Sequence, residues 1–170
     1  LERIRKEMKL DYLVLLTAQD RSSVSSELAR RAFGGDAQQG VRIIGQEELT
    51  HMGAEVARRC RIPVVSTPKA RPSECREIVD AMALECAQPF TGLSGGVERV
   101  IYGGRILNRN FALIDMMHNF VFEDRLYQTK PVGTVTIFQN DVRIATNVLD
   151  KEGKRAVGTR VSQIVYDRVI

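Results

Sequence analysis

The chain has 170 residues and a formal net charge of +4, and 44% of its residues are hydrophobic, which is enough for one substantial core or two small ones. Its longest purely apolar stretches, such as Leu13 to Leu16, run only a few residues, whereas a membrane-spanning helix needs about 20. The sequence therefore predicts a soluble globular fold. Because it opens at Leu1 on a charged, helix-like run, we expect it to be an excised piece of a longer protein.

The first half of the chain alternates between helical and extended patterns. Apolar residues at helical spacing predict the end of a helix over 1–9, and the run LDYLVLL predicts a buried strand over 10–16. Residues 21–33 stay ambiguous between turn, strand and helix. The next expected elements are a strand at 41–44, an amphipathic helix at 46–60, an extended segment at 62–65, a loop at 67–73, and antiparallel strands at 81–90 and 97–107 around a turn at 91–96.

The second half begins with a helix predicted over 109–122 and capped by Asn108. Its buried face would carry Phe111, Ile114, Met117 and Val121, and a break follows at 129–133. The runs 134–138 and 142–148, separated by Gln139, Asn140 and Asp141, predict a tight hairpin. A last helix over 158–170 is expected to begin at a Thr159–Arg160 cap with a surface cation, and to turn Val161, Ile164, Val165 and Val169 inward.

Strand pairs that are local in sequence, with helices covering one face, favour an α+β fold with an antiparallel sheet. The helix that follows Asn108 is the natural boundary between two units.

Several classes of function lack their motifs. The basic residues are scattered, with no run of five or six like charges, so no nucleic-acid partner is expected. Cys60, Cys75 and Cys86 are irregularly spaced and His51 and His118 are far apart, so we expect core thiols, surface or capping imidazoles, no metal and no cofactor. One disulfide stays open if the compartment is oxidising.

No enzymatic motif stands out either. The chain has no nucleophile elbow and no phosphate-binding loop signature, and the Gly103–Gly104 pair is interpreted as a packing or turn feature. We therefore predict that the chain is not an enzyme.

Two stretches carry a family resemblance. The first is YGGRILNRN at 102–110, which precedes a helix; the second comprises GTVTIF at 133–138, RIATNV at 143–148 and GKRAVGTRV at 153–161, with Val165 and Tyr166 behind it. Together they resemble the Cache sensor domains, the extracytoplasmic PAS-like domains of bacterial receptors, and most closely the tandem Cache modules ahead of histidine kinases and chemoreceptors.

The resemblance implies a PAS-like antiparallel sheet with flanking helices. It places a membrane-distal unit at 1–107, and a linking helix with the first half of a membrane-proximal unit at 108–170. Residues 22–48 diverge from the family pattern. Because the family's second unit continues with three further strands, we expect the second PAS-like sheet to be incomplete.

A sensor needs a pocket with a few convergent polar groups, and an anionic ligand needs cations or amide donors there. The candidate ligand-binding residues are Lys69, Arg71, Glu85, Gln88, Tyr102 and Arg105 in the first unit and Arg143, Thr146 and Arg155 in the second. Alternation puts Glu85 and Gln88 on opposite faces of their strand, and the sequence leaves open which face lines a pocket. Ordinary surface exposure is the competing interpretation for each residue.

The resemblance implies a small-molecule-sensing domain in the periplasm, belonging to an inner-membrane receptor such as a histidine kinase or a chemotaxis protein. Ligand binding, with an anionic ligand among the options, would be relayed as a conformational change, and the full-length receptor would be a homodimer. The competing hypothesis is a soluble intracellular ligand-binding regulatory module, which three apparently free cysteines favour slightly.

Overall fold

The computed structural model describes residues 1–93, 95–123, 125–128 and 130–169, without the side chains of Lys130 and Pro131. Parts of three sequence predictions lie outside these residues: Ser94 in the turn at 91–96, Thr129 at the break after the long helix, and Ile170 at the end of the last helix. The chain forms two compact units. Unit 1 comprises residues 1–44 and 82–106, and unit 2 comprises residues 45–81 and 107–170.

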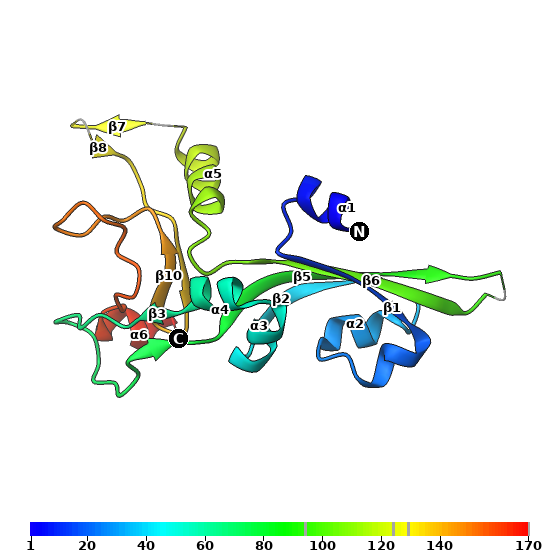
Figure 1. The fold of residues 1–170 in the computed structure, drawn as a ribbon. Coiled ribbons are helices and arrows are strands. Elements are labelled where there is room, and N and C mark those ends of the chain that lie inside the picture. Colours follow the sequence, from blue (N-terminus) through cyan, green and yellow to red (C-terminus); the bar gives the residue numbers. More distant parts are fainter. Residues whose placement is uncertain (94, 124, 129, 170) are drawn as a thin grey trace. The chain divides into compact units, whose positions relative to one another are not determined.

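Unit 1 is built on a four-stranded sheet in the order β1-β6-β5-β2 (Figure 1). The central strands β5 (Ala81–Thr91) and β6 (Val97–Ile106) pair antiparallel, and β1 (Tyr12–Thr17) pairs antiparallel with β6. Strand β2 (Gln38–Ile44) forms the other edge. Helix α1 (Glu2–Glu7) lies on one side of this sheet, and the 3-10 helix η1 (Ala18–Ser22) and α2 (Glu27–Ala32) lie on the other.

The two faces of this sheet differ in burial, as the period of two along a strand requires. The side that α2 covers is buried and carries the core of unit 1, which includes Tyr12, Leu16, Ala83, Ala87, Val100 and Ile106. The opposite side leaves Leu15, Leu84 and Phe90 at least one-third exposed. The core of unit 1 therefore lies on one side of the sheet only.

Unit 2 contains short helices and three two-stranded ladders. Its elements are α3 (Gln46–Met52), α4 (Ala54–Cys60), β3 (Ile62–Pro63), β4 (Glu77–Ile78), α5 (Phe111–Phe122), β7 (Leu126–Tyr127), β8 (Lys130–Pro131), β9 (Thr136–Gln139), β10 (Val142–Thr146) and α6 (Gln163–Val169). The pairs are β3 with β4, β7 with β8, and β9 with β10. Its core includes Leu49, Ile62, Ile114, Val142 and Ile144.

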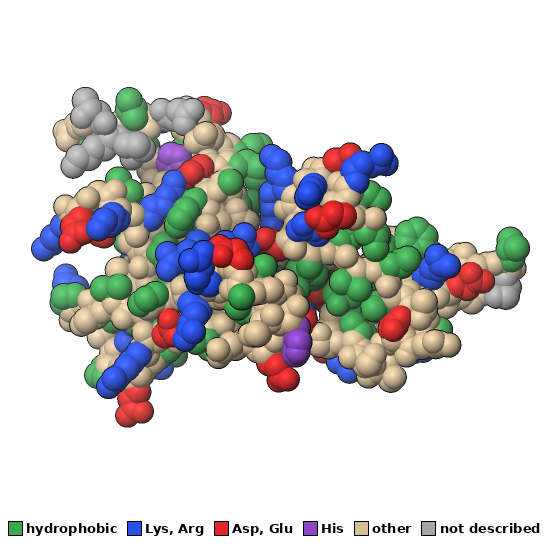
Figure 2. All heavy atoms as spheres, viewed as in Figure 1, with side chains coloured by type: hydrophobic (Ala, Val, Ile, Leu, Met, Phe, Trp, Pro, Cys, Tyr) green, Lys and Arg blue, Asp and Glu red, His purple; other side chains and the backbone are tan. Residues whose placement is uncertain are grey.

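The α+β class with an antiparallel PAS-like sheet is confirmed. So is the hairpin, whose two-residue turn contains Asn140 at a left-handed φ of 52°. The side chains of lysine and arginine are interspersed with acidic ones over the visible face, as their scatter in the sequence predicted (Figure 2). The division of the chain into two Cache-like units after residue 107 stays a prediction. The compact units of the structure are divided differently, because residues 45–81 belong to the same unit as residues 107–170.

Two predictions about helices are wrong in detail. The expected helix over 46–60 is broken into α3 and α4 at Gly53, whose φ of 133° no helical residue adopts. Helix α5 is capped by Asn110, whose side chain accepts from the Leu113 amide. The residue expected to cap it, Asn108, is instead buried and donates from Nδ2 to the carbonyl oxygens of Cys60 and Asp80.

The buried faces of the two C-terminal helices also differ from those expected. In α5 the buried residues are Ile114 and His118, whereas Met117 and Val121 are exposed. His118 is held inward by a 2.9 Å hydrogen bond between Nε2 and the Val132 carbonyl. Helix α6 begins at Gln163, later than the expected start at residue 158, and none of its described residues is buried. In the described residues, β9 and β10 form a two-stranded sheet.

Candidate functional site

A buried carboxylate lies at the centre of the covered face of unit 1. Glu85 on β5 is 3% exposed and contacts three polar side chains from three other parts of the unit. Tyr12 Oη on β1 donates to Glu85 Oε1 at 2.9 Å, and Ser26 Oγ donates to Oε2 at 2.5 Å. The Arg42 guanidinium on β2 lies 3.3 Å from Oε1. Burying a charge is costly unless it is paired and hydrogen-bonded, and Glu85 has both kinds of partner.

Gly104 makes the contact between Tyr12 and Glu85 sterically feasible. Tyr12, Gly104 and Glu85 stand side by side on β1, β6 and β5, so the tyrosine ring must cross the central strand to reach the carboxylate. A Cβ at Gly104 would lie 2.5 Å from Tyr12 Cζ and 2.9 Å from the Leu84 carbonyl oxygen. The packing role predicted for this glycine is confirmed, because the missing side chain leaves the space that the ring fills.

Two further contacts make the cluster rigid. Ser26 is the N-cap of α2 and accepts from the Ala29 amide at 3.1 Å while it donates to Glu85. The rings of Tyr12 and Tyr102 meet edge to face at 6.1 Å between centroids. Burial, and then the Glu85 charge, raise the pKa of Tyr12 above its usual range, so its hydroxyl stays a donor at neutral pH. The cluster thus joins α2, β1, β2 and β5.

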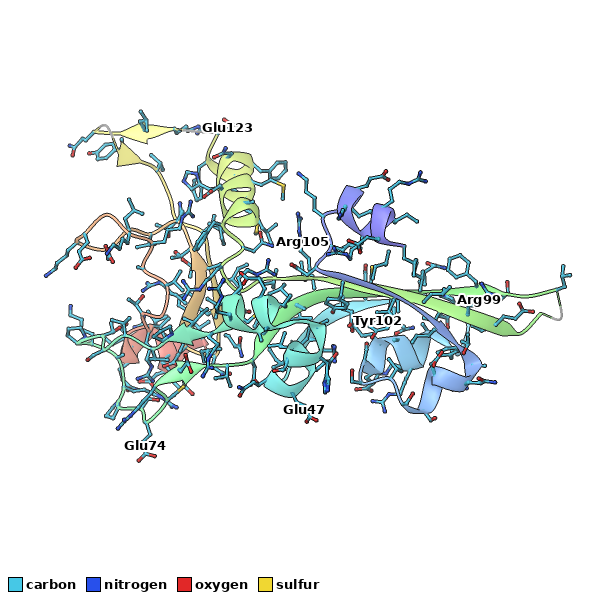
Figure 3. The ribbon with its side chains drawn as sticks, viewed as in Figure 1. Glu47, Glu74, Arg99, Tyr102, Arg105 and Glu123 are labelled. Carbon is cyan, nitrogen blue, oxygen red and sulfur yellow. The ribbon has the colours of Figure 1, made fainter. Side chains whose placement is uncertain are left out.

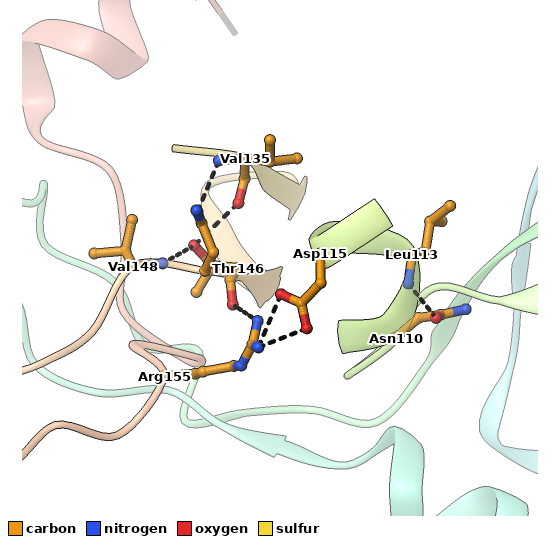
Figure 4. A network of polar contacts seen from close by, with 8 residues as sticks. Asn110, Leu113, Asp115, Val135, Thr146, Val148 and Arg155 are labelled. Carbon is orange, nitrogen blue, oxygen red and sulfur yellow. Dashed lines mark hydrogen bonds and ion pairs between the residues drawn. The ribbon is translucent and has the colours of Figure 1, made fainter. Parts of the chain in front are cut away.

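Unit 2 has a second polar network, between α5 and the segment that follows β10 (Figure 4). Arg155 Nη2 donates to both carboxylate oxygens of Asp115 at 2.9 and 2.8 Å, and Nη1 donates to the Thr146 carbonyl. The guanidinium also lies 4.7 Å from the centre of the Phe111 ring. Thr146 is fully buried and shares a hydrogen bond with the Thr136 hydroxyl across the hairpin.

A buried ion pair holds the loop of residues 64–73 against the hairpin turn. The Arg160 guanidinium donates to Asp141 Oδ2 from Nε at 2.8 Å, and both residues are less than one-tenth exposed. Arg160 Nη1 donates to the Arg71 carbonyl, and the Arg160 amide donates to Thr67 Oγ1. The prediction that Arg160 is a surface cation at a helix cap is therefore wrong: its segment pairs with β10 through Val142, and α6 begins later.

The comparison with protein families identifies the C-terminal part of the chain. Residues 105–170 match the model of the family described as single Cache domain 3. This part of the chain is therefore similar to a Cache sensor domain. No curated protein and no solved structure matches the chain. The match overlaps the stretch from Tyr102 to Tyr166 that carried the resemblance in the sequence, while the tandem arrangement stays a prediction.

Cache domains are generally non-catalytic ligand-binding modules that sense small molecules outside the cell in signalling receptors. Across the described ranges, no helix is long and apolar enough to cross a membrane. Among those same residues, no three His, Cys, Asp or Glu side chains gather in a group that could hold a metal ion.

The predicted ligand-binding residues of this chain do not form one cluster. Glu85 and Tyr102 share the buried face of unit 1. Figure 3 shows Tyr102 on the side of β6 that faces α2 and Arg105 on the opposite side. Gln88 also lies on that opposite side, where it lines a cavity. The remaining five belong to unit 2: Lys69, Arg71, Arg143, Thr146 and Arg155, the last of which is paired with Asp115.

The environments of the other four unit 2 candidates range from exposed to fully buried. Lys69 and Arg71 are exposed in the loop, and the Arg71 guanidinium stacks 4.0 Å from the centre of the Tyr166 ring. Arg143 is half-buried on β10, where Nη1 donates to Thr159 Oγ1 at 2.7 Å, and burial lowers its pKa. Thr146 is occupied by hydrogen bonds inside the hairpin.

The sequence did not point to Tyr12, Ser26 or Arg42, which are the partners of Glu85. The sequence offered an N-cap signal at Ser26 before ELARRA. Its pairing with Glu85, however, depends on a helix start and a strand 59 residues apart coming together. The pairs Asp115–Arg155 and Asp141–Arg160 were missed for the same reason.

Proposed function

We propose that this chain is the periplasmic small-molecule-sensing region of a bacterial inner-membrane receptor, either a sensor histidine kinase or a chemotaxis receptor. The observation that carries the proposal is the match of residues 105–170 to a Cache family. A ligand would shift the population between two arrangements of the domain, and a homodimeric receptor would pass the shift across the membrane. Nucleic acid has no part in the proposal.

The environment of Arg143 supports an anionic ligand. Its side chain is half-buried, and among the described residues no carboxylate lies within ion-pair distance of it. Two arginines near it in the sequence, Arg155 and Arg160, each have a carboxylate partner. A guanidinium with open donors suits a carboxylate or phosphate group.

A thermal-shift screen of the chain against carboxylates, amino acids, amines and purines tests the proposal. A ligand at a hundred times its Kd adds about 2.7 kcal/mol of stability, which raises the melting temperature measurably. We expect hits within one anionic class that disappear in Arg143→Gln and persist in the control Arg99→Gln, an exposed arginine of unit 1. Absence of stabilisation by every class would contradict direct ligand sensing by this chain.

The location of the domain is tested separately with its own thiols. Cys75 and Cys86 are exposed and Cys60 is buried. In intact cells that carry the full-length receptor, a membrane-impermeant maleimide should label the two exposed thiols if the domain is periplasmic. Labelling only after lysis would instead favour the soluble intracellular regulatory module, the alternative that free cysteines support.

A further inference from the structure

A cavity of about 470 Å³ lies on the side of the unit 1 sheet that faces away from α2. Its roof comes from Ile4 of α1 and from Met8, which caps the C-terminal end of that helix. Its floor comes from the strands, through Leu13, Cys86 and Ile101. The Glu85 cluster occupies the other face, so the two are separate features. The volume lies within the range of about 300–1,000 Å³ that small-molecule pockets occupy.

No charged side chain lines the cavity among the residues that the structure describes. The charges of α1 are engaged elsewhere: Arg5 bonds Glu2 from Nε at 2.9 Å, and its Nη1 donates to the carbonyl oxygens of Leu10 and Asp11 at 3.2 Å each. These last two bonds also fasten the C-terminal end of α1 to the start of β1. The polar groups at the cavity are the neutral amides of Gln38, Gln39 and Gln88 and the thiol of Cys86.

Gly103 shapes the floor. A Cβ at this position would lie 2.8 Å from the Tyr12 carbonyl oxygen and 2.9 Å from Leu13 Cδ1, so the strand accepts only glycine beside these atoms without a shift. Cys86 stands directly across from Gly103 in the β5–β6 register, so no side chain of that neighbour covers its sulfur. The thiol is accordingly exposed.

We propose that this cavity is a second binding site, which takes a small, uncharged and mainly apolar molecule. Apolar walls with a few neutral donors and acceptors match such a ligand, whereas an anion or a cation would lose its hydration without gaining a partner. The concave shape, with α1 above and strands below, suits a compact molecule rather than a flat protein surface. The site does not depend on the proposed receptor function or on Arg143.

The test uses the neutral fluorophore N-phenylnaphthylamine and its sulfonated analogue, which has the same rings plus one negative charge. We expect the neutral probe to bind the chain with one-to-one stoichiometry and at least about tenfold more tightly than the sulfonate, a difference that corresponds to about 1.4 kcal/mol. Saturating neutral probe should slow the reaction of Cys86 with a thiol reagent by a similar factor, while exposed Cys75 in unit 2 reacts at an unchanged rate.

Two variants make the experiment specific. Cys86→Leu fills part of the floor and should weaken neutral-probe binding about tenfold, whereas Leu84→Ala, on the same face but outside the lining, should leave it unchanged. Equal binding of both fluorophores, equal protection of both thiols, or equal weakening by both variants would overturn the proposal. Protection of Cys86 that rises with protein concentration without probe would also overturn it, because a second copy would then cover this face.

Discussion

Replacing Glu85 by Gln tests whether the buried carboxylate is the group that fastens the covered face of unit 1. Gln keeps the shape of the side chain but removes its charge, and it places an NH2 donor where the hydroxyls of Tyr12 and Ser26 and the Arg42 guanidinium already donate. The side chain of Glu85 is fully buried, and that of Arg42 is 14% exposed, so solvent replaces little of the lost interaction.

Breaking a buried ion pair by removing one partner costs about 3–5 kcal/mol. We expect Glu85→Gln to lie near the lower end, at about 3 kcal/mol, because Gln retains one acceptor oxygen and the hydroxyls can rotate. For a chain of this size, that loss lowers the melting temperature by roughly 6–12 °C.

Urea unfolding followed by circular dichroism measures the loss. Hydrogen exchange localises it, since exchange should become faster in the elements that the cluster joins, β1, β2, β5 and α2. Glu98→Gln is the matched control, an exposed glutamate on β6 of the same sheet, and it should stay within about 0.5 kcal/mol of the wild type. If Glu85→Gln were as stable as this control, the Glu85 cluster would contribute nothing and the reasoning would be refuted.

Three further predictions follow from other contacts. The pKa of Tyr12 in the folded chain lies above its value near 10 in the unfolded chain. The stability that the protonated hydroxyl contributes is therefore complete below about pH 10 and is lost as the pH rises beyond it. Tyr12→Phe should flatten the decline in the urea midpoint above about pH 10. Gly104→Ala should destabilise the chain by more than about 2 kcal/mol, because the added methyl would overlap the Tyr12 ring and approach the backbone. Gly96→Ala is the control, because a Cβ there would have no atom within 4 Å. In thermal melts this control should change the stability by less than about 0.5 kcal/mol. Asp141→Asn should release the loop that Arg160 holds, so that trypsin cleaves after Lys69 faster than in the wild type, as mass spectrometry of timed digests would detect; an unchanged cleavage rate would show that the ion pair does not hold the loop.

Features that depend on neighbouring residues could be predicted from the sequence alone. Alternation along 81–90 predicted a strand with Glu85 and Gln88 on opposite faces, and two β-rich runs around Asn140 predicted the hairpin. The family resemblance from Tyr102 to Tyr166 could also be recognised from the sequence, because it depends on the order in which residue types follow one another along the chain. Even the break at Gly53 had a local sign, since glycine is the residue that accepts its φ of 133°.

The tertiary structure alone decided which groups meet. Glu85 became a buried ion-pair partner because β1, β2 and α2, far away in the sequence, bring Tyr12, Arg42 and Ser26 to it. The chain order gives no sign of such a meeting, nor of the cavity beneath α1, because each depends on which sheet face another element covers. Periodicity assigns a residue to a face; only the packing of distant segments determines whether that face is core, cavity or solvent-exposed surface.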